Sequence, residues 1–352
     1  MERHGQPSAG SSAAEARGCF VIAEIGSNHN RDLDEAHRLI AASAEAGADA
    51  AKFQTYAADT LYSRRAPRLS EMASFPGDDG RVTPHEMIAA LELPREWHGE
   101  LAAHCRELGI EFMSTPFDLD AVAELDPLVD RHKLASTDLT NRPLVQACAA
   151  TGKPLVLSTG LAFLGEVEEA LGWVWEVDAS LPVTLLHCTT QYPTPFAEVN
   201  LRAMGTLGGA LGCPVGLSDH SLGIEVPVAA AALGATMLEK HVTGDRAHPG
   251  PDHRFALEPD ELVAMVRAIR NVEAALGSPR KRPLASELEN RLLARRSLHV
   301  AVSLPAGAPI EAAHLAILRP GTGIRPADAG LVVGRRLTRA LEAGEPLTWD
   351  AL

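Results

Sequence analysis

The sequence has few cysteines, few aromatic residues and no excess of positive charge. Its formal net charge is −14, which argues against nucleic acid or an anionic membrane as a partner. No apolar run reaches the length that crosses a membrane. Residues 1–18 contain no apolar signal core, and we predict that they form a disordered tail.

The pattern of cysteines indicates whether the protein works in a reducing or an oxidising compartment. They are scattered, odd in number and form no CxxC pair: Cys19, Cys105, Cys148, Cys188 and Cys213. This pattern argues against a disulfide framework and against a thiolate zinc site. It predicts a cytoplasmic protein, because the cytoplasm keeps thiols reduced.

The residues that are abundant predict the fold. Hydrophobic residues make up 46% of the chain and aromatic residues only 4%, so Ala, Leu and Val must fill the core. Eight short apolar runs are each followed by a helical pattern, at 20–26, 50–56, 110–116, 132–137, 154–160, 183–190, 214–220 and 236–242. Eight strands that alternate with helices predict an α/β fold, a (β/α)8 TIM barrel over 19–278. A doubly wound open sheet is the alternative, but no GxGxxG follows the first run to favour it.

The composition changes after residue 278. A charged stretch with two prolines, 279–296, predicts a linker. The remainder, 297–352, is rich in Gly, Pro and Val, which predicts a second domain of short strands and turns. So small a domain has little core of its own, and we expect it to pack against the barrel or a second subunit.

Polar residues fall at the ends of all eight predicted strands, where the active sites of TIM barrels lie. In chain order they include Glu24, Lys52, Gln54, Thr115, Lys133, Ser136, Asp138, Ser158, Thr190, Tyr192, Ser218, His220, Glu239 and His241. The two lysines and the short hydroxyls suit a small substrate with phosphate and carboxylate groups. A single Ser or Thr at such a position more often caps a helix, whereas Lys52, flanked by apolar residues, must face a lined cavity or be paired.

His220 and His241 end neighbouring strands, so we expect their side chains to lie close together over the cavity. One such histidine alone would more often be structural. Two imidazoles with open positions suit Mn²⁺, Zn²⁺, Fe²⁺ or Co²⁺ acting on a carbonyl group. A lysine on a barrel strand can instead form a Schiff base, which makes an aldolase the rival interpretation, although that chemistry does not require the paired histidines.

The motifs resemble those of the sialic acid synthases, which are nonulosonic acid synthases. The matching segments are AEIGSNHN, GADAAKFQT, FMSTPFD, HKLASTDLTN, LSTG, LLHCTTQYPTP, VNLRAM, GLSDHSLG, EKHVTGD, PGPDH, ARRSL and LRPGTGI. They occur in this order over residues 19–352, and the C-terminal part, 297–352, resembles the antifreeze-like (SAF) domain of the family. The resemblance implies that phosphoenolpyruvate condenses with an open-chain N-acylmannosamine-type sugar, giving phosphate and a 2-keto-3-deoxy nine-carbon acid.

The resemblance also implies roles for single residues. Phosphoenolpyruvate would contact Lys52, Thr115, Lys133, Ser136, Ser158, Thr190 and Ser218, and the sugar would contact Gln54, Asp138, Tyr192 and Asp252. His220 and His241 would bind a divalent metal, Mn²⁺ in the first place and Mg²⁺ or Co²⁺ as alternatives, and they would act in catalysis with Glu24 and Asp138. Arg319 would reach from the SAF domain of one subunit into the barrel of the other, which implies a domain-swapped homodimer.

The sequence departs from the family pattern near the expected sugar position. Asn30 and Arg31 follow His29 where HNG is usual, Ala135 and Thr137 stand where KIGSG has glycines, Asp138 replaces a common Glu, and segment 63–83 is unusual. The acceptor is therefore open among N-acetylmannosamine, its 6-phosphate and a diacetamido deoxy sugar. We predict a synthase rather than a Schiff-base aldolase or a non-catalytic sugar-binding protein, because sugar binding alone requires neither a metal nor a phosphate site.

Overall fold

The computed structural model describes residues 18–67 and 82–352. It divides between Gly277 and Ser278 into two compact units, each with its own hydrophobic core. Residues 1–17 of the predicted tail and 68–81 of the unusual segment lie outside the described residues. In the described part of the chain, no helix is both long and apolar enough to cross a membrane.

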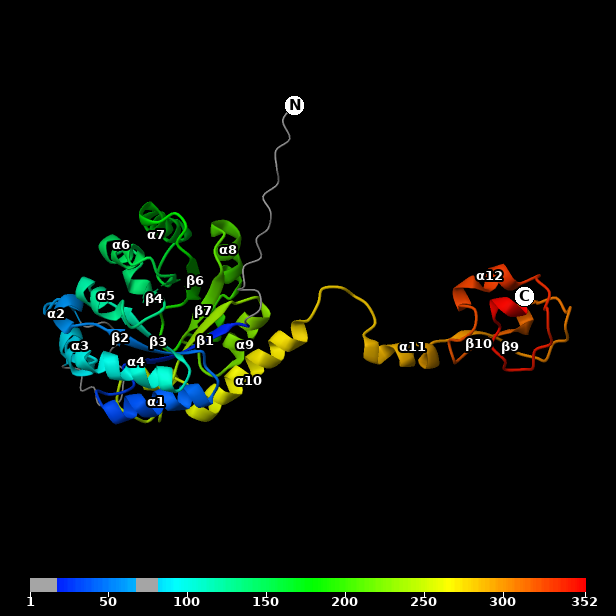
Figure 1. Ribbon diagram of the computed structural model, residues 1–352, viewed down its shortest axis with the longest axis horizontal. Helices are drawn as coiled ribbons and strands as arrows, with labels where there is room; N and C mark the ends of the chain where they lie inside the picture. Colours follow the sequence, from blue (N-terminus) through cyan, green and yellow to red (C-terminus); the bar gives the residue numbers. More distant parts are fainter. Residues whose placement is uncertain (1–17, 68–81) are drawn as a thin grey trace, which may run out of the picture. The chain divides into compact units, whose positions relative to one another are not determined.

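Eight parallel strands form the first unit, and each lies within one of the eight predicted runs (Figure 1). They are β1 (Phe20–Gly26), β2 (Ala50–Thr55), β3 (Glu111–Pro116), β4 (His132–Leu134), β5 (Leu155–Ser158), β6 (Val183–Cys188), β7 (Val215–Asp219) and β8 (Met237–His241). The hydrogen-bonded series begins at β3, passes through the β1 and β8 pair, and ends at β4. Its two end strands, β3 and β4, are in contact, so the sheet curls into the predicted barrel with one seam.

Helices follow the strands in the first unit, and most of them cover the outside of the barrel (Figure 1). They are α1 (Leu33–Glu45), α2 (Ala58–Leu61), α3 (Pro84–Leu91), α4 (His98–Glu107), α5 (Leu119–Leu125), α6 (Arg142–Ala150), α7 (Leu164–Val177), α8 (Arg202–Leu211), α9 (Glu225–Ala232) and α10 (Pro259–Leu276). In α1, the side chain of Asp32 accepts from the Glu35 amide at the N-terminus, and Ala36, Leu39 and Ile40 are buried. This is the capped, one-sided apolar pattern that packs a helix on a sheet.

The interior of the barrel is layered, because side chains two residues apart on a strand share a face. A small apolar cluster forms one layer: Ile22, Ala50, Met113, Val156, Leu186 and Met237. Two residues further along the same strands stand Glu24, Lys52, Thr115, Ser158, Cys188 and Glu239. The strand alternation thus places a polar layer directly beyond an apolar floor, at the C-terminal end of the barrel.

The seam between β3 and β4 is bridged by an ion pair at its lower end. Nε and Nη2 of Arg131, just before β4, each lie 2.8 Å from a carboxylate oxygen of Glu111, the first residue of β3. The same guanidinium lies 4.4 Å from the centre of the Phe20 ring. This paired geometry ties together two strands that end the hydrogen-bonded series.

The second unit contains α11 (Leu288–Ala294), the antiparallel pair β9 (Ser297–Val300) and β10 (Leu315–Leu318), and α12 (Ala329–Val332). Its core is made of buried aliphatic side chains, among them Leu298, Val300, Ile324, Val332 and Leu347. Helix α11 lies inside the predicted linker, 279–296, where the sequence analysis expected no element. The amide of Gly321 donates to the carbonyl of Leu292 at 2.7 Å, so the end of this stretch is attached to the second unit.

Seven of the eight observed strands are shorter than the predicted runs, by one to three residues, and β4 and β6 show the reason. The run 132–137 was expected to continue as a strand, but β4 ends at Leu134 and a 3-10 turn follows at Ser136–Asp138. The run 183–190 likewise continues beyond the end of β6 at Cys188. In both cases the last polar residues leave the strand and form the loops above the polar layer, because turn hydrogen bonds replace those of the sheet.

Candidate active site

A cavity of about 280 Å³ opens at the C-terminal ends of the strands. Its lining includes most of the predicted site residues: Glu24, Lys52, Gln54, Thr115, Lys133, Ser136, Ser158, Thr190, Tyr192, Ser218, His220, His241 and Asp252. The expectation that polar strand ends converge is therefore confirmed, although the role of each residue stays a prediction.

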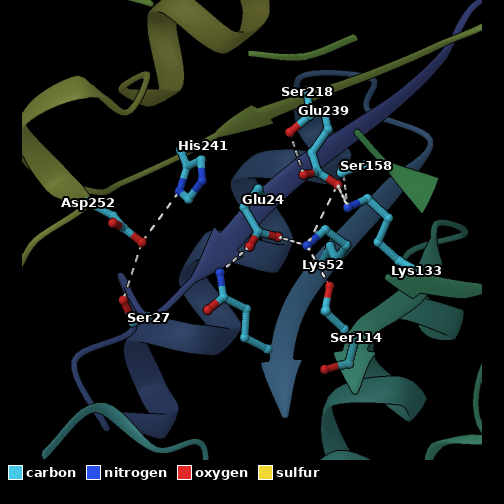
Figure 2. A network of polar contacts seen from close by, with 12 residues as sticks. Glu24, Ser27, Lys52, Ser114, Lys133, Ser158, Ser218, Glu239, His241 and Asp252 are labelled. Carbon is cyan, nitrogen blue, oxygen red and sulfur yellow. Dashed lines mark hydrogen bonds and ion pairs between the residues drawn. The ribbon is translucent and has the colours of Figure 1, made fainter. Parts of the chain in front are cut away.

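Lys52 lies between two acidic side chains at the base of the cavity (Figure 2). Its Nζ is 2.6 Å from Oε2 of Glu24 and 3.6 Å from Oε2 of Glu239, and it donates to Oγ1 of Thr115 at 3.1 Å. All three charged groups are nearly inaccessible to solvent. Such charges are stable only when they are paired, and this arrangement provides the pairing.

Lys133 approaches the same centre from β4 (Figure 2). Its Nζ donates to Oγ of Ser158 at 2.8 Å and to the carbonyl of Leu134 at 3.2 Å. It also lies 3.6 Å from Oε2 of Glu239. Glu239 therefore faces both lysines through one oxygen, while its other oxygen accepts from Oγ of Ser218 at 2.9 Å.

The pKa values of the two carboxylates of this cluster are shifted in opposite directions. Burial raises the pKa of Glu24 to about 7, with Lys52 opposing the shift. Burial also acts on Glu239, but there Lys133 and Lys52 outweigh it and lower the pKa to about 2. Glu239 is thus the counter-charge of both lysines, whereas burial makes Glu24 the more readily protonated of the two carboxylates.

His220 and His241 lie side by side, as expected for the ends of β7 and β8, with ring centres 5.3 Å apart. Nδ1 of His220 lies 2.9 Å from the carbonyl oxygen of Thr189. Because that carbonyl can only accept, Nδ1 carries a proton and Nε2 is left as the basic nitrogen. Nδ1 of His241 is buried without a hydrogen bond in the described structure and lies 3.7 Å from Oδ2 of Asp252.

These two imidazoles fit a borderline divalent metal ion. Each offers one basic nitrogen, the rings are adjacent, and the buried orphan nitrogen of His241 is a donor atom without a partner. Within the described residues, no group of three or more His, Cys, Asp and Glu side chains is arranged to hold a metal. A metal here would therefore need further ligands from water or substrate, which is typical of catalytic sites.

The side of the cavity where the sequence analysis expects the sugar combines polar and apolar surfaces. Nε2 of Gln54 donates to Oε1 of Glu24 at 2.7 Å, and the ring centres of Tyr192 and His220 lie 4.3 Å apart with the rings tilted by 49°. Burial raises the pKa of Asp252 to about 6, and its Oδ2 lies 3.5 Å from Oγ of Ser27. Other lining residues form an apolar wall of the cavity: Tyr56, Tyr62, Met87, Ile88, Leu91 and Phe117.

Three loops meet closely where the phosphate-binding hydroxyls were predicted. The Gly160 amide donates to Oγ of Ser136 at 2.9 Å. A Cβ at Gly160 would lie only 2.3 Å from Oγ1 of Thr190, so this approach requires glycine. Oγ1 of Thr190 is itself buried without a partner in the described structure, which leaves a hydroxyl ready for a ligand.

Two of the predicted site residues, one from each unit, are not among the lining residues of the cavity. Asp138 is not among its lining residues, and its carboxylate accepts from Asn141 at 3.2 Å and from Thr137 at 3.3 Å. Arg319 is an exposed residue of the second unit. The proposed roles of both residues remain predictions.

The sequence analysis assigned no role to Glu239, Cys188 or the apolar wall. Glu239 lies two residues before His241 on β8, so strand alternation already placed both on one face. Cys188 lines the cavity, with Sγ 3.9 Å from Nδ1 of His220. The wall residues Met87, Ile88 and Leu91 gave no signal, because helix α3 is far from any strand end in the sequence.

Comparisons with known proteins agree with the fold and the motifs. A model of the NeuB family matches residues 39–281, and a model of the SAF domain matches residues 295–352. The chain is 44% identical to N,N'-diacetyllegionaminic acid synthase of Legionella pneumophila, over 94% of each protein. It is 34% identical to N-acetylneuraminate-9-phosphate synthase of Homo sapiens, over 94% of this chain and 91% of that protein.

A solved structure supports the same assignment. N-acetylneuraminic acid synthetase from Leptospira borgpetersenii, crystallised with citrate, superposes with a TM-score of 0.69 at 34% identity. The match covers 78% of this chain and 90% of that one. The chain therefore belongs to the NeuB family of nonulosonic acid synthases, and its C-terminal part is a SAF domain.

Proposed function

We propose that the protein condenses phosphoenolpyruvate with the open-chain aldehyde of an N-acylmannosamine-type sugar, forming a 2-keto-3-deoxy nine-carbon acid and inorganic phosphate. The observation that supports it most is one cavity in which two lysines and several hydroxyls adjoin a pair of imidazoles. The first group suits a phosphorylated carboxylic acid and the second suits a carbonyl group held by a metal.

Phosphoenolpyruvate binds at the base of the cavity. Lys133 and Ser158, and Lys52 and Thr115, already form donor pairs at 2.8 and 3.1 Å. The partnerless Thr190 hydroxyl, with Ser136 and Ser218, completes the set of short donors around the phosphate and carboxylate. Charge-assisted hydrogen bonds of this kind bind a dianion strongly because the site is buried.

The acceptor lies above, next to His220, His241 and the polar groups of Gln54, Tyr192 and Asp252. A divalent ion on the two histidines, Mn²⁺ in our proposal and Mg²⁺ or Co²⁺ as alternatives, would supply Lewis-acid polarisation of the aldehyde. Carbon three of phosphoenolpyruvate then forms the new bond to the aldehyde carbon, and the carbonyl oxygen takes a proton. Water adds at carbon two, and the carbon–oxygen bond to phosphate breaks to leave the ketone.

Glu24 is our candidate for the proton acceptor of the attacking water. It lines the cavity beside Lys52 and Gln54, and its pKa of about 7 is near the optimum for a general base. Asp138, the other predicted carboxylate, would need a change in its loop to face the cavity, because Asn141 and Thr137 engage it.

A Schiff-base aldolase receives less support. The ion pairs with Glu239 and Glu24 outweigh burial and raise the pKa of Lys52, which keeps the amine protonated and non-nucleophilic. Burial lowers the pKa of Lys133, so that lysine is the one to examine for covalent trapping by borohydride with pyruvate.

The assembly is also part of the proposal. We infer a cytoplasmic, domain-swapped homodimer in which Arg319 enters the site of the other subunit. The five free cysteines fit a reducing compartment. Light scattering gives the oligomeric state, and mixing subunits that carry Arg319→Ala with subunits that carry His220→Ala tests whether the sites are shared, since a shared arrangement restores activity to part of the dimers.

The decisive experiment measures phosphate release from phosphoenolpyruvate with Mn²⁺ and a panel of N-acylated sugars. Chelated protein and the His220→Ala variant are the controls. Release that depends on sugar, metal and His220 is expected. Folded, metal-loaded protein that releases no phosphate with any of the sugars would refute the proposed function.

A further inference from the structure

Glu239 lies between the two lysines of the cavity but is not hydrogen-bonded to either of them (Figure 2). Its Oε2 is 3.6 Å from Nζ of Lys52 and 3.6 Å from Nζ of Lys133, beyond hydrogen-bonding distance. This oxygen is buried without a hydrogen bond in the described structure, while the other oxygen accepts from Oγ of Ser218 at 2.9 Å. Glu239 therefore acts on the two lysines through its charge.

The ammonium groups of this lysine pair, Lys52 and Lys133, retain donors for a ligand. An ammonium has three N–H groups. Lys133 donates to Ser158 at 2.8 Å and to a backbone carbonyl at 3.2 Å, which leaves its third N–H group. Lys52 donates to Thr115 at 3.1 Å and faces Glu24 at 2.6 Å, which likewise leaves one. Because Glu239 takes up none of these donors, an anion can bind to both lysines while Glu239 stays in place.

An anion at the lysine pair would nevertheless meet the charge of Glu239. Two ammonium groups and two carboxylates form the cluster, and all four side chains are nearly inaccessible to solvent. Charges interact strongly in such a buried site. Glu239 lines the same cavity and lies equally far from both lysines, so its repulsion of a bound anion cancels part of their attraction.

We infer that Glu239 limits the affinity of the lysine pair for anions, which allows the phosphate product to leave the cavity. The inference rests on the proposed function for the identity of the product, but the charge arrangement does not depend on that reaction. The alternative is that Glu239 only stabilises the buried lysines. The two roles predict opposite results: loss of the Glu239 charge strengthens anion binding in the first and weakens it in the second.

Glu239→Gln tests the sign of this effect. Glutamine has the same shape, and its side-chain oxygen can still accept from Ser218, so the main change is the lost charge. Calorimetry measures the binding of inorganic phosphate, and of phosphoenolpyruvate, to full-length protein at equal Mn²⁺ content. We expect binding at least about tenfold tighter than in wild type, because unit charges a few ångströms apart in a buried site interact by more than a tenfold change in affinity requires. Equal or weaker binding overturns the inference, and so does an absence of phosphate binding in both proteins.

Glu111→Gln is the matched control. Glu111 begins β3 at the other end of the barrel, is paired with Arg131, and is not among the residues that line the cavity. The variant loses the same charge by the same substitution. Its affinity for phosphate should equal that of wild type. A similar gain in both variants would show a general effect of net charge and would contradict the role of Glu239.

A second pair of variants covers the case in which Glu239→Gln alone does not fold. In a Lys133→Met background, Lys52 keeps Glu24 as its partner, so adding Glu239→Gln leaves no member of the cluster unpaired. We expect the double variant to bind phosphate more tightly than Lys133→Met does, with circular dichroism showing that both are folded. The reverse order of affinities contradicts the inference.

Turnover separates this inference from the proposed function. In Glu239→Gln, both kcat and the KM for phosphoenolpyruvate should fall, and added phosphate should inhibit more strongly, since slower product release limits the rate. A purely stabilising role would raise the KM instead. If the wild type releases no phosphate with any sugar, the proposed function fails and the calorimetric ratio still decides the inference. If the wild type turns over but Glu239→Gln binds phosphate no more tightly, the proposed function stands and the inference fails.

Discussion

The buried carboxylate of Glu239 lies between two lysines, and it makes their contributions to stability and to substrate binding unequal. Glu239 faces Lys52 and Lys133 at 3.6 Å each, and Glu24 pairs with Lys52 alone at 2.6 Å. Lys52 therefore has two acidic partners, whereas Lys133 shares its acidic partner. Removing Lys133 leaves every carboxylate with a cation, but removing Lys52 does not, so the two lysines should differ in their effects on stability and on binding.

Lys133→Met should weaken phosphoenolpyruvate binding with little loss of stability. The variant loses a charge-assisted donor, which contributes about 1.5–3 kcal/mol, while Lys52 still compensates Glu239. We expect the KM for phosphoenolpyruvate to rise about tenfold to a hundredfold on this basis. Steady-state kinetics and thermal unfolding measure the two effects. Lys153→Met, a lysine outside the cavity, is the control, and an unchanged KM in Lys133→Met would contradict the assignment.

His29 should make stability depend on pH. Its Nδ1 accepts from the Arg31 amide at 3.0 Å, and burial lowers its pKa to about 4, with Arg31 and His253 contributing. An unfolded histidine has a pKa of about 6.5. Below that pH the unfolded chain binds the proton more readily than the native protein does, so stability falls as the pH drops from about 6.5 to about 4.

His29→Asn isolates this contribution, because an asparagine oxygen can accept from the Arg31 amide as Nδ1 does. The difference in free energy of unfolding between wild type and variant should be constant above pH 7 and shrink by at most about 1.4 kcal/mol per pH unit between about 6.5 and 4. Urea unfolding at several pH values measures it. Parallel curves for the two proteins would show that His29 titrates normally in the native state.

At the scale of single elements, β7 and β8 carry different groups on their two faces. Ser218 and His220, and Glu239 and His241, line the cavity, whereas Asp219 and Lys240 alternate with them. Nζ of Lys240 lies 2.6 Å from Oδ2 of Asp219, and that carboxylate also accepts from the amide and hydroxyl of Ser221 at 3.0 and 2.9 Å. This buried ion pair joins the two strands at the level of the two histidines.

Asp219→Asn should therefore destabilise the barrel and weaken metal binding together. Losing one partner of a buried ion pair costs about 3–5 kcal/mol, because Lys240 is left charged and unpaired. Adding Lys240→Met to this variant removes the stranded charge and should recover part of the loss. Calorimetric unfolding and Mn²⁺ titration measure both quantities. A single variant as stable as wild type would exclude a role of the pair in holding the strands.

Local periodicity explains what the sequence could predict and what it could not. Strand alternation placed Lys52, Lys133 and the histidines at one end of the barrel, and the structure confirms it. The orientation of the Asp138 side chain could not be predicted. It depends on the 3-10 turn at Ser136–Asp138, whose backbone hydrogen bonds form in place of a continued β4. The wall on α3 depends on long-range docking through Tyr56. A periodic pattern in the sequence cannot indicate such a long-range contact.

At the scale of the whole molecule, the two units are joined by an exposed stretch. Residues 278–283 are all exposed and have no helix or strand assignment, and they contain Arg280 and Lys281. Limited trypsin digestion should cut after one of these residues and leave two large fragments, since proteases select exposed, irregular backbone. Mass spectrometry locates the junction. A protein with both residues changed to Ser is the control, and an uncut junction in the wild type would show that the stretch is protected.

At the seam, β3 and β4 are in contact but are not neighbours in the hydrogen-bonded series of the barrel. Because the two strands at the seam are not joined in the hydrogen-bonded series, their spacing can change slightly without breaking a backbone hydrogen bond of the sheet. Among the described residues, Arg131 and Glu111 link the lower end of the seam. Its upper end lies between Thr115 of β3 and Lys133 of β4, both lining the cavity. An anion held by both residues would link β3 and β4 at this upper end. Phosphoenolpyruvate should then slow amide hydrogen exchange in β3 and β4 more than in β6 and β7, so that the substrate becomes a structural member of the barrel that binds it.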